Sequence, residues 1–211
     1  MRDICVIFDL DGTLVDSEAL CNQAFIDLLP ALDCPVEVLI QRYRGKKLST
    51  ILADIERQTG KILPNTFEAE YRKRVAELFA RTLKPIPGVI EMLDRLSHSK
   101  CIASSGPPEK IRQALEVSGL ASYFEHRIFS SYDIGCWKPD PGLFLHAARE
   151  MGFEPGQCVV VEDSEVGIQA AIAAEMEAFH FMPPNSSASL HEGTVFHEMS
   201  QLTELLAAVS A

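Results

Sequence analysis

Five short apolar segments, rich in β-branched or aromatic residues, recur along the chain. They lie at residues 4–8, 100–104, 127–130, 158–162 and 178–182. The first (I-C-V-I-F) and the fourth (C-V-V-V-E) are nearly continuous apolar runs, which is typical of strands buried on both faces of a parallel sheet. The pattern therefore predicts five strands, of which these two are fully buried.

Between the predicted strands, apolar residues recur with the spacing of a helix that buries one face. Such faces occur at 87–97, 108–118, 140–151, 164–174 and 200–210. Gly119 is well placed to end the second of these helices. The stretch P-P-N-S-S-A-S at 183–189 is predicted to be a loop. Strands that alternate with helices predict an open α/β sheet with right-handed crossovers.

Residues 16–84 interrupt this alternation, because they contain no convincing strand pattern. Three amphipathic helical faces are found there instead: Leu20, Ala24, Phe25 and Leu28; Leu48, Ile51, Leu52 and Ile55; Phe67, Tyr71, Val75 and Leu78. Ser17 is a suitable N-cap for the first helix. We therefore predict an α/β core formed by residues 1–15 and 85–211, with an all-helical domain inserted at 16–84.

Composition narrows the class of protein. With 211 residues, 47% of them apolar and 23% charged, the chain has the profile of a soluble globular protein with one sizeable core. No apolar run reaches the roughly 18 residues of a membrane helix. The N-terminus lacks the layout of a signal peptide, which predicts a cytoplasmic protein.

The formal net charge of −11 argues against partners such as nucleic acid or an acidic membrane. A small anionic substrate would need a few local cations. The six cysteines form no C-x-x-C pair and are expected to be free thiols, and the six histidines show no metal-site spacing. Nothing in the pattern indicates an oligomer, so a monomer is the default expectation.

Polar side chains that could take part in catalysis or ligand binding follow four of the predicted strands. They are Asp9 and Asp11 after the first, Ser104 and Ser105 after the second, Lys138 in the loop after the third, and Glu162 and Asp163 after the fourth. Ligands of open α/β sheets bind outside the carboxyl ends of the strands. We therefore expect these groups to converge on one site.

The chemistry of these groups is mutually consistent. Clustered carboxylates need a cation, and ligands made only of oxygen suit Mg²⁺, which shares its sites with phosphate. One carboxylate can act as a nucleophile and form an acyl phosphate, while a second transfers protons. Lys138 would neutralise the transferring phosphoryl group. Ser104, with the backbone N–H groups of Ser105 and Gly106, would hold a phosphate oxygen.

Four motifs in this order, F-D-L-D-G-T, I-A-S-S-G, W-K-P-D-P and V-V-V-E-D-S, resemble those of phosphatases of the haloacid dehalogenase (HAD) superfamily. The resemblance covers nearly the whole chain, because the insertion after the first motif is similar to the helical C1 cap of that family. It implies a HAD-like Rossmannoid core and Mg²⁺ as cofactor. Asp9 would be the nucleophile, and Asp11 the general acid/base whose backbone carbonyl also binds the metal.

The same resemblance implies that Asp163 is the other direct metal ligand, with Glu162 beside it, and that Ser104 and Lys138 bind phosphate. Two further stretches, R-G-K-K-L-S at 44–49 and S-S-Y-D-I-G-C-W-K-P-D-P at 130–141, are similar to bacterial sugar-phosphate phosphatases of the 6-phosphogluconate type, near the β-phosphoglucomutase branch. A small phosphorylated metabolite is therefore the expected substrate.

Ordinary structural roles compete with these interpretations. Asp-Gly is common in turns, Glu162 and Asp163 would favour a helix N-terminus, and Lys138 could be a surface lysine. In the inserted domain, Arg44, Lys46 and Lys47 either form an anion-binding loop that faces the site or a solvated basic turn. Residues 72–74 (R-K-R) are expected to be a solvated face.

Several functions remain open. A phosphomutase uses the same core chemistry, but mutases of this family carry a histidine early in the first cap helix, where this chain reads E-A-L-C-N-Q. Dehalogenases lack an acid equivalent to Asp11, and transport ATPases have membrane segments and D-K-T in place of D-L-D. A phosphonatase would need a lysine from the insertion. A non-catalytic sensor should lack one of the catalytic groups, and none is missing.

Overall fold

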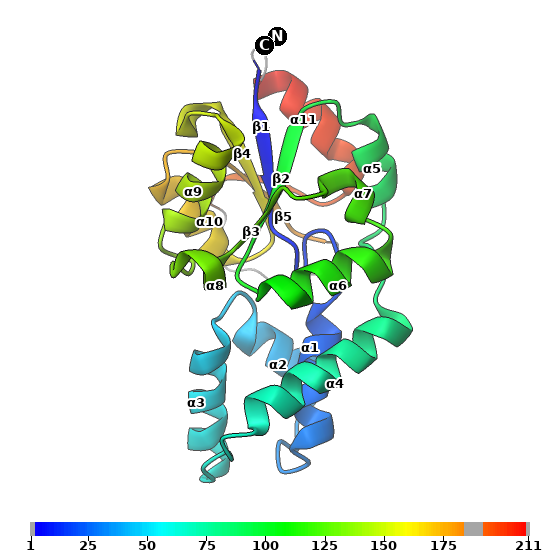
Figure 1. The fold of residues 1–211 in the computed structure, drawn as a ribbon, viewed down its shortest axis with the longest axis vertical. Coiled ribbons are helices and arrows are strands. Elements are labelled where there is room, and N and C mark those ends of the chain that lie inside the picture. The colour runs from blue at the N-terminus through cyan, green and yellow to red at the C-terminus, as the bar shows by residue number, and fades with distance from the viewer. Residues whose placement is uncertain (1–2, 184–191, 210–211) are drawn as a thin grey trace.

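A six-stranded parallel sheet forms the centre of the computed structural model, which describes residues 3–183 and 192–209 (Figure 1). The strand order is β3-β2-β1-β4-β5-β6. The strands are β1 (Cys5–Phe8), β2 (Ser99–Ser104), β3 (Ile128–Ser130), β4 (Cys158–Glu162), β5 (Glu177–Phe181) and β6 (Thr194–Phe196). The α/β fold class is confirmed, and all five predicted strands are present.

The sixth strand, β6, was missed by the sequence prediction. It contains only three residues, T-V-F, and pairs with β5 at the edge of the sheet. A three-residue strand is too short to show an alternating pattern. The loop predicted at 183–189 lies, beyond Pro183, outside the described residues.

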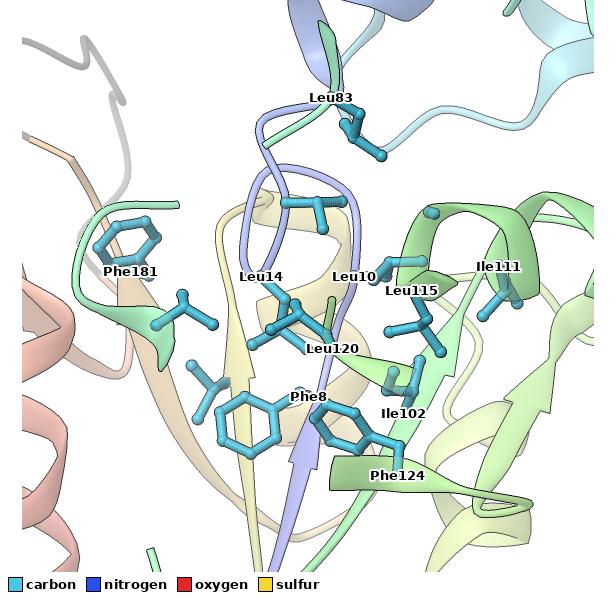
Figure 2. Packing of buried hydrophobic residues seen from close by; sticks show 14 of the residues in the cluster. Phe8, Leu10, Leu14, Leu83, Ile102, Ile111, Leu115, Leu120, Phe124 and Phe181 are labelled. Carbon is cyan, nitrogen blue, oxygen red and sulfur yellow. The ribbon is translucent and has the colours of Figure 1, made fainter. Parts of the chain in front are cut away.

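Alternation along the strands sends side chains to two apolar layers. Val6 and Phe8 of β1 pack in the larger cluster, which is shown in Figure 2 with the ring of Phe124 beside that of Phe8. Cys5 and Ile7 face the other side of the sheet. The central strands β1 and β4 are buried along their whole length, as their apolar sequences predict.

Helices cover both layers. One side has α5 (Val89–Arg95), α6 (Pro108–Ser118), α7 (Ala121–Phe124) and α11 (Leu202–Val209). The other has α8 (Ser131–Ile134), α9 (Gly142–Met151) and α10 (Glu165–Ala173). Two short 3₁₀ turns, η1 (Pro155–Gln157) and η2 (Met199–Gln201), precede β4 and α11. As predicted, α6 ends at Gly119, which has a left-handed backbone conformation.

Four helices between β1 and α5 lie beyond the carboxyl ends of the strands (Figure 1). These cap helices are α1 (Glu18–Leu28), α2 (Val36–Tyr43), α3 (Leu48–Thr59) and α4 (Phe67–Thr82). They pack around aromatic residues: the rings of Phe25 and Tyr71 stack with centroids 4.2 Å apart, and Tyr43 meets Phe25 edge-on. Among the described residues of the insertion no strand occurs, as expected.

The chain passes between the sheet and the cap helices through two adjacent segments. The N–H of Asp16 donates to the carbonyl of Lys84 at 3.0 Å, and the N–H of Ile86 donates to the carbonyl of Leu14 at 2.9 Å. The outgoing and returning segments are therefore fastened to each other. In the described part of the chain, no helix is long and apolar enough to cross a membrane.

Candidate active site

A cavity of ≈ 440 Å³ lies between the carboxyl edge of the sheet and the cap helices. The predicted site residues that line it are Asp9, Asp11, Lys46, Ser105, Gly106, Lys138, Glu162 and Asp163. The strand ends therefore converge on one site, as their order along the chain predicts. Of the other predicted residues, Ser104 is buried just behind the wall, and Arg44 and Lys47 contact groups at its edge.

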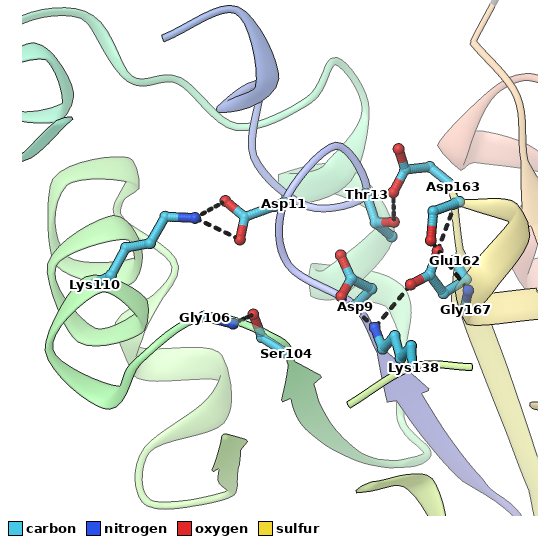
Figure 3. A network of polar contacts seen from close by, with 11 residues as sticks. Asp9, Asp11, Thr13, Ser104, Gly106, Lys110, Lys138, Glu162, Asp163 and Gly167 are labelled. Carbon is cyan, nitrogen blue, oxygen red and sulfur yellow. Dashed lines mark hydrogen bonds and ion pairs between the residues drawn. The ribbon is translucent and has the colours of Figure 1, made fainter. Parts of the chain in front are cut away.

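Lys138 is the buried cation of the cavity. Its ammonium lies 2.5 Å from Asp9 Oδ1 and 2.7 Å from Glu162 Oε1, and its side chain is 2% exposed (Figure 3). Burial opposes its charge, but the two carboxylates outweigh burial and raise the pKa of Lys138 above its ordinary value. The lysine therefore stays charged while it contacts the candidate nucleophile.

Glu162 is fixed between Lys138 and the start of α10. The backbone N–H of Ser164 donates to Glu162 Oε2 at 2.5 Å, and the hydroxyl of Ser164 caps the helix by accepting from the N–H of Gly167. A Cβ on Gly167 would lie 2.0 Å from the Glu162 carboxylate. Only glycine leaves room for this acid, so the E-D-S-E-V-G sequence is shaped around it.

Asp163 is held by the D-G-T part of the first motif. The hydroxyl of Thr13 donates to Asp163 Oδ1 at 3.1 Å, and Arg44 Nε lies 3.6 Å from Oδ2. Gly12 has a φ of +83°, and a Cβ there would lie 2.4 Å from Asp163 Oδ2. The close approach of Gly12 therefore brings the first and fourth motifs together.

Asp9 and Asp163 carry more negative charge than their neighbours neutralise. Burial and the nearby acids, Glu162 above all, raise the pKa of both carboxyl groups well above the ordinary range. A divalent cation would relieve this repulsion, and two carboxylates with the backbone carbonyl of Asp11 form a set of oxygen donors suited to Mg²⁺. In the described residues, no three His, Cys, Asp or Glu side chains converge as metal ligands.

Asp11 has a different environment from Asp9. Lys110 Nζ lies 2.7 Å from both of its carboxylate oxygens, and the hydroxyl of Ser17 donates to Oδ1 at 2.5 Å. Burial alone would raise the pKa of Asp11, but these contacts lower it below its ordinary value. Ser17 was predicted to cap α1. Its side chain bonds Asp11 instead and makes no cap bond.

The predicted phosphate loop follows β2. The N–H of Gly106 donates to Ser104 Oγ at 3.1 Å, and the carbonyl of Gly106 accepts from the hydroxyl of Ser130 at 2.7 Å. Residues 104–107 thus form a compact turn that leads directly into α6. The N–H of Gly106 is engaged with Ser104 in this arrangement, while Ser105 and Gly106 line the cavity.

The three cations of the loop before α3, Arg44, Lys46 and Lys47, have different surroundings. Arg44 reaches Asp163, Lys46 lines the cavity but is largely exposed, and the ammonium of Lys47 lies 3.4 Å from the centre of the Trp137 ring. Gly45 lies against Ser164, which a Cβ at position 45 would meet at 2.8 Å. The loop therefore packs on the fourth motif, while roles for these three cations in substrate binding remain predictions.

The polar residues of the cavity wall that sequence reasoning missed include Glu18, Asn22, Arg72 and Lys110. Arg72 was expected in a solvated face, but it bonds the hydroxyl of Tyr132 at 2.9 Å as well as Glu68. Glu18 is partly buried, and desolvation together with the charge of Asp11 raises its pKa to about 7. Lys110 could have been suspected from its place in the first turn of a helix that begins at the carboxyl edge of the sheet.

Comparisons with known proteins agree with this geometry. The family model described as haloacid dehalogenase-like hydrolase matches residues 5–175. A 6-phosphogluconate phosphatase of Escherichia coli (strain K12) is 38% identical over 206 residues, covering 95% of this chain and 93% of the relative. A fructose-1-phosphate phosphatase of the same strain is 30% identical over 176 residues, covering 82% and 93%.

Among solved structures, a haloacid dehalogenase-like protein of unknown function from Agrobacterium tumefaciens str. C58 superimposes with a TM-score of 0.85. It is 32% identical in sequence, and the match covers 99% of this chain and 100% of the other. The predicted family and the expectation of a phosphatase enzyme are confirmed by the family model and the named relatives. The chain belongs to the haloacid dehalogenase-like hydrolase family.

Proposed function

We propose that this protein hydrolyses a small phosphomonoester, a sugar or sugar-acid phosphate such as 6-phosphogluconate, in a Mg²⁺-dependent reaction. The observation that carries the proposal is Asp9, a buried carboxylate on the cavity wall that contacts the charged ammonium of Lys138 at 2.5 Å. A nucleophile with a phosphate-neutralising cation beside it is the minimum apparatus of covalent phosphoryl transfer.

In the first step, an oxygen of Asp9 attacks phosphorus, and the bond between phosphorus and the leaving oxygen breaks. Asp11 donates a proton to that leaving oxygen, so the alcohol departs neutral. In the second step, Asp11 takes a proton from water, whose oxygen attacks the phosphoryl group on Asp9. The P–O bond to Asp9 then breaks, and phosphate and the free carboxylate of Asp9 are restored.

The remaining groups bind the phosphoryl oxygens. Lys138 supplies positive charge from the Asp9 side. Ser105 and Gly106 line the cavity at the start of α6, and with Ser104 behind them they would donate to phosphate once the Gly106 N–H leaves Ser104 Oγ. Asp9, Asp163 and the backbone carbonyl of Asp11 would hold Mg²⁺. When bound, the metal would neutralise the clustered acids and the transferring phosphoryl group.

The position of the cap helices is consistent with a small substrate. Residues 16–84 would form a cap domain on a core made of residues 1–15 and 85–211, and substrate would bind between them. The cap side of the cavity has an apolar wall that includes Phe25, Leu48 and Ile51. A volume of ≈ 440 Å³ suits a phosphorylated sugar, the class named for both reported relatives. The enzyme would act in the cytoplasm as a monomer, without nucleic acid or membrane partners.

Hydrolysis is favoured over the phosphomutase alternative. The first turns of α1 present Glu18, Cys21 and Asn22 to the cavity, and no histidine is found among the described lining residues. Water is therefore the acceptor that we propose for the second step.

Phosphate release from a panel of phosphomonoesters tests the proposal. The panel contains 6-phosphogluconate, hexose and pentose phosphates, glycolate phosphate and mononucleotides, each with Mg²⁺ and with a chelator. We expect release that the chelator abolishes, confined to sugar or sugar-acid phosphates. Folded protein that releases phosphate from no member would refute hydrolysis, and isomerisation of β-glucose 1-phosphate would then be measured.

A further inference from the structure

Lys110 occupies a position that the proposed mechanism does not use. It lies in the first turn of α6 and lines the cavity, with its side chain 22% exposed. In Figure 3, Lys110 and Lys138 reach toward the two aspartates from opposite sides, Lys110 at Asp11 and Lys138 at Asp9. Lys110 is therefore placed on the leaving-group side of the site, away from the phosphate cation.

The contact of Lys110 with Asp11 engages both oxygens of that carboxylate. Oδ1 accepts from Lys110 and Ser17, and Oδ2 accepts from Lys110, each lysine contact being 2.7 Å. A general acid must bring an oxygen within hydrogen-bond reach of the leaving group. In the observed arrangement Lys110 engages both oxygens of Asp11, so replacement of that contact would free an oxygen of Asp11 to face the leaving group.

The other cations of the described cavity wall contact different partners. Lys138 contacts Asp9 and Glu162, and Arg72 contacts Glu68 and Tyr132. Lys46 is exposed at the rim. Lys110 is thus a partly buried cation whose present partner, Asp11, has another role in the proposed reaction. An anionic group of the substrate could replace that partner.

We propose that Lys110 recognises a second anionic group, such as a carboxylate, on the leaving part of the substrate, and that this exchange of partner releases Asp11 for catalysis. The inference rests on the proposed function and deepens it. A substrate with a second anion both binds Lys110 and frees the acid. A substrate with a neutral leaving part leaves the Lys110–Asp11 pair intact.

Two substrates that carry phosphate on the same carbon distinguish an anionic from a neutral leaving part. They are 6-phosphogluconate, which ends in a carboxylate, and glucose 6-phosphate, which does not. We compare kcat and KM at saturating Mg²⁺ for the wild type, Lys110→Met, Lys110→Arg and the control Lys73→Met, whose side chain is exposed on α4. A lost charge-assisted contact should lower kcat/KM on 6-phosphogluconate about 10- to 100-fold in Lys110→Met. On glucose 6-phosphate, kcat should stay the same or rise, since Asp11 is released.

Lys110→Arg keeps the charge and should keep most of the preference, and Lys73→Met should match the wild type. Equal losses on both substrates in Lys110→Met, or no loss on either, would overturn the inference and leave Lys110 a structural residue. A wild type that acts on glucose 6-phosphate alone would overturn it as well.

A binding measurement separates this inference from the proposed function. Calorimetry gives the Kd of both compounds for Asp9→Asn and for Asp9→Asn/Lys110→Met, neither of which needs turnover. Tighter binding of 6-phosphogluconate that the double variant loses supports the role of Lys110 even where the wild type releases no phosphate. Absence of that preference in Asp9→Asn refutes the role, whatever the enzyme hydrolyses.

Discussion

The ammonium of Lys47, at the start of α3, lies 3.4 Å from the centre of the Trp137 ring. Trp137 directly precedes Lys138, and its ring meets that of Tyr132 edge-on with centroids 5.5 Å apart. Arg72 of α4 contacts Tyr132 in turn. Two cations from the cap helices therefore lie on neighbouring rings, Lys47 on Trp137 and Arg72 on Tyr132. Both rings belong to the segment that leads to Lys138, the candidate phosphate-binding lysine.

Removing the Lys47 charge should weaken the contact between the loop before α3 and Trp137, next to the candidate phosphate-binding Lys138. A cation–π contact contributes about 0.5–2 kcal/mol, so Lys47→Met should raise KM roughly 2- to 30-fold with little change in Tm. Lys61→Met, an exposed lysine after the same helix, is the matched control. Unchanged KM in Lys47→Met, measured by phosphate release, would show that the contact does not affect substrate binding.

Asp9→Asn should abolish turnover while the fold persists. The amide cannot form the covalent intermediate, so kcat should fall by at least ~10³-fold. Tm should not decrease, because the substitution removes a carboxylate whose pKa burial and the neighbouring acids raise. Phosphate release and thermal unfolding test both parts. An Asp9→Asn protein with wild-type kcat would contradict the assignment of the nucleophile.

Gly167→Ala should displace Glu162, because the new Cβ would lie 2.0 Å from its carboxylate. Overpacking of this kind costs about 1–3 kcal/mol, and each kcal/mol corresponds to roughly 2–4 °C of Tm in a chain of this size. Gly156→Ala is the control, since a Cβ there meets open space. Equal Tm values for the two variants would show that Glu162 can move without cost.

Glu18 should make stability depend on pH. Burial raises its pKa from 4.5 to about 7, so the folded protein holds a proton that the unfolded chain loses first. This contribution to stability is full below pH ~4.5 and is lost as pH rises through the folded pKa. Glu18→Gln should therefore stabilise the protein more at pH 8.5 than at pH 5. Denaturant titration at both pH values tests the sign, and a difference that does not grow with pH would contradict it.

The arrangement of the core could be predicted from the sequence because its signals are local. Three of the four motifs immediately follow an apolar run and the fourth lies in the loop after β3, and parallel strands bring such positions to one edge. The position of Asp9 beside Lys138 follows from this rule, although the two are 129 residues apart. The insertion at 16–84 was visible because helical spacing replaced the strand pattern.

The partners of long cations could not be predicted in this way. Lys110, Arg72 and Lys47 each reach a group on another element. For Arg72 and Lys47 that partner depends on how the cap helices pack against the core, and for Lys110 it depends on how α6 lies beside the loop after β1. Ser17 had a plausible local partner at the start of α1, but Asp11 provides a stronger, charged acceptor. Sequence spacing contains no information about such long-range competition.

The paired segments at Leu14–Asp16 and Lys84–Ile86 have an evolutionary consequence. Because the chain leaves and returns at one place, the path of the core does not depend on what lies between the two segments. With the proposed function, mutation, lengthening or recombination of residues 18–82 would thus change which leaving group is admitted. Descendants of one ancestral enzyme could acquire new metabolites as substrates in this way, with the apparatus for cleaving the phosphate ester inherited intact.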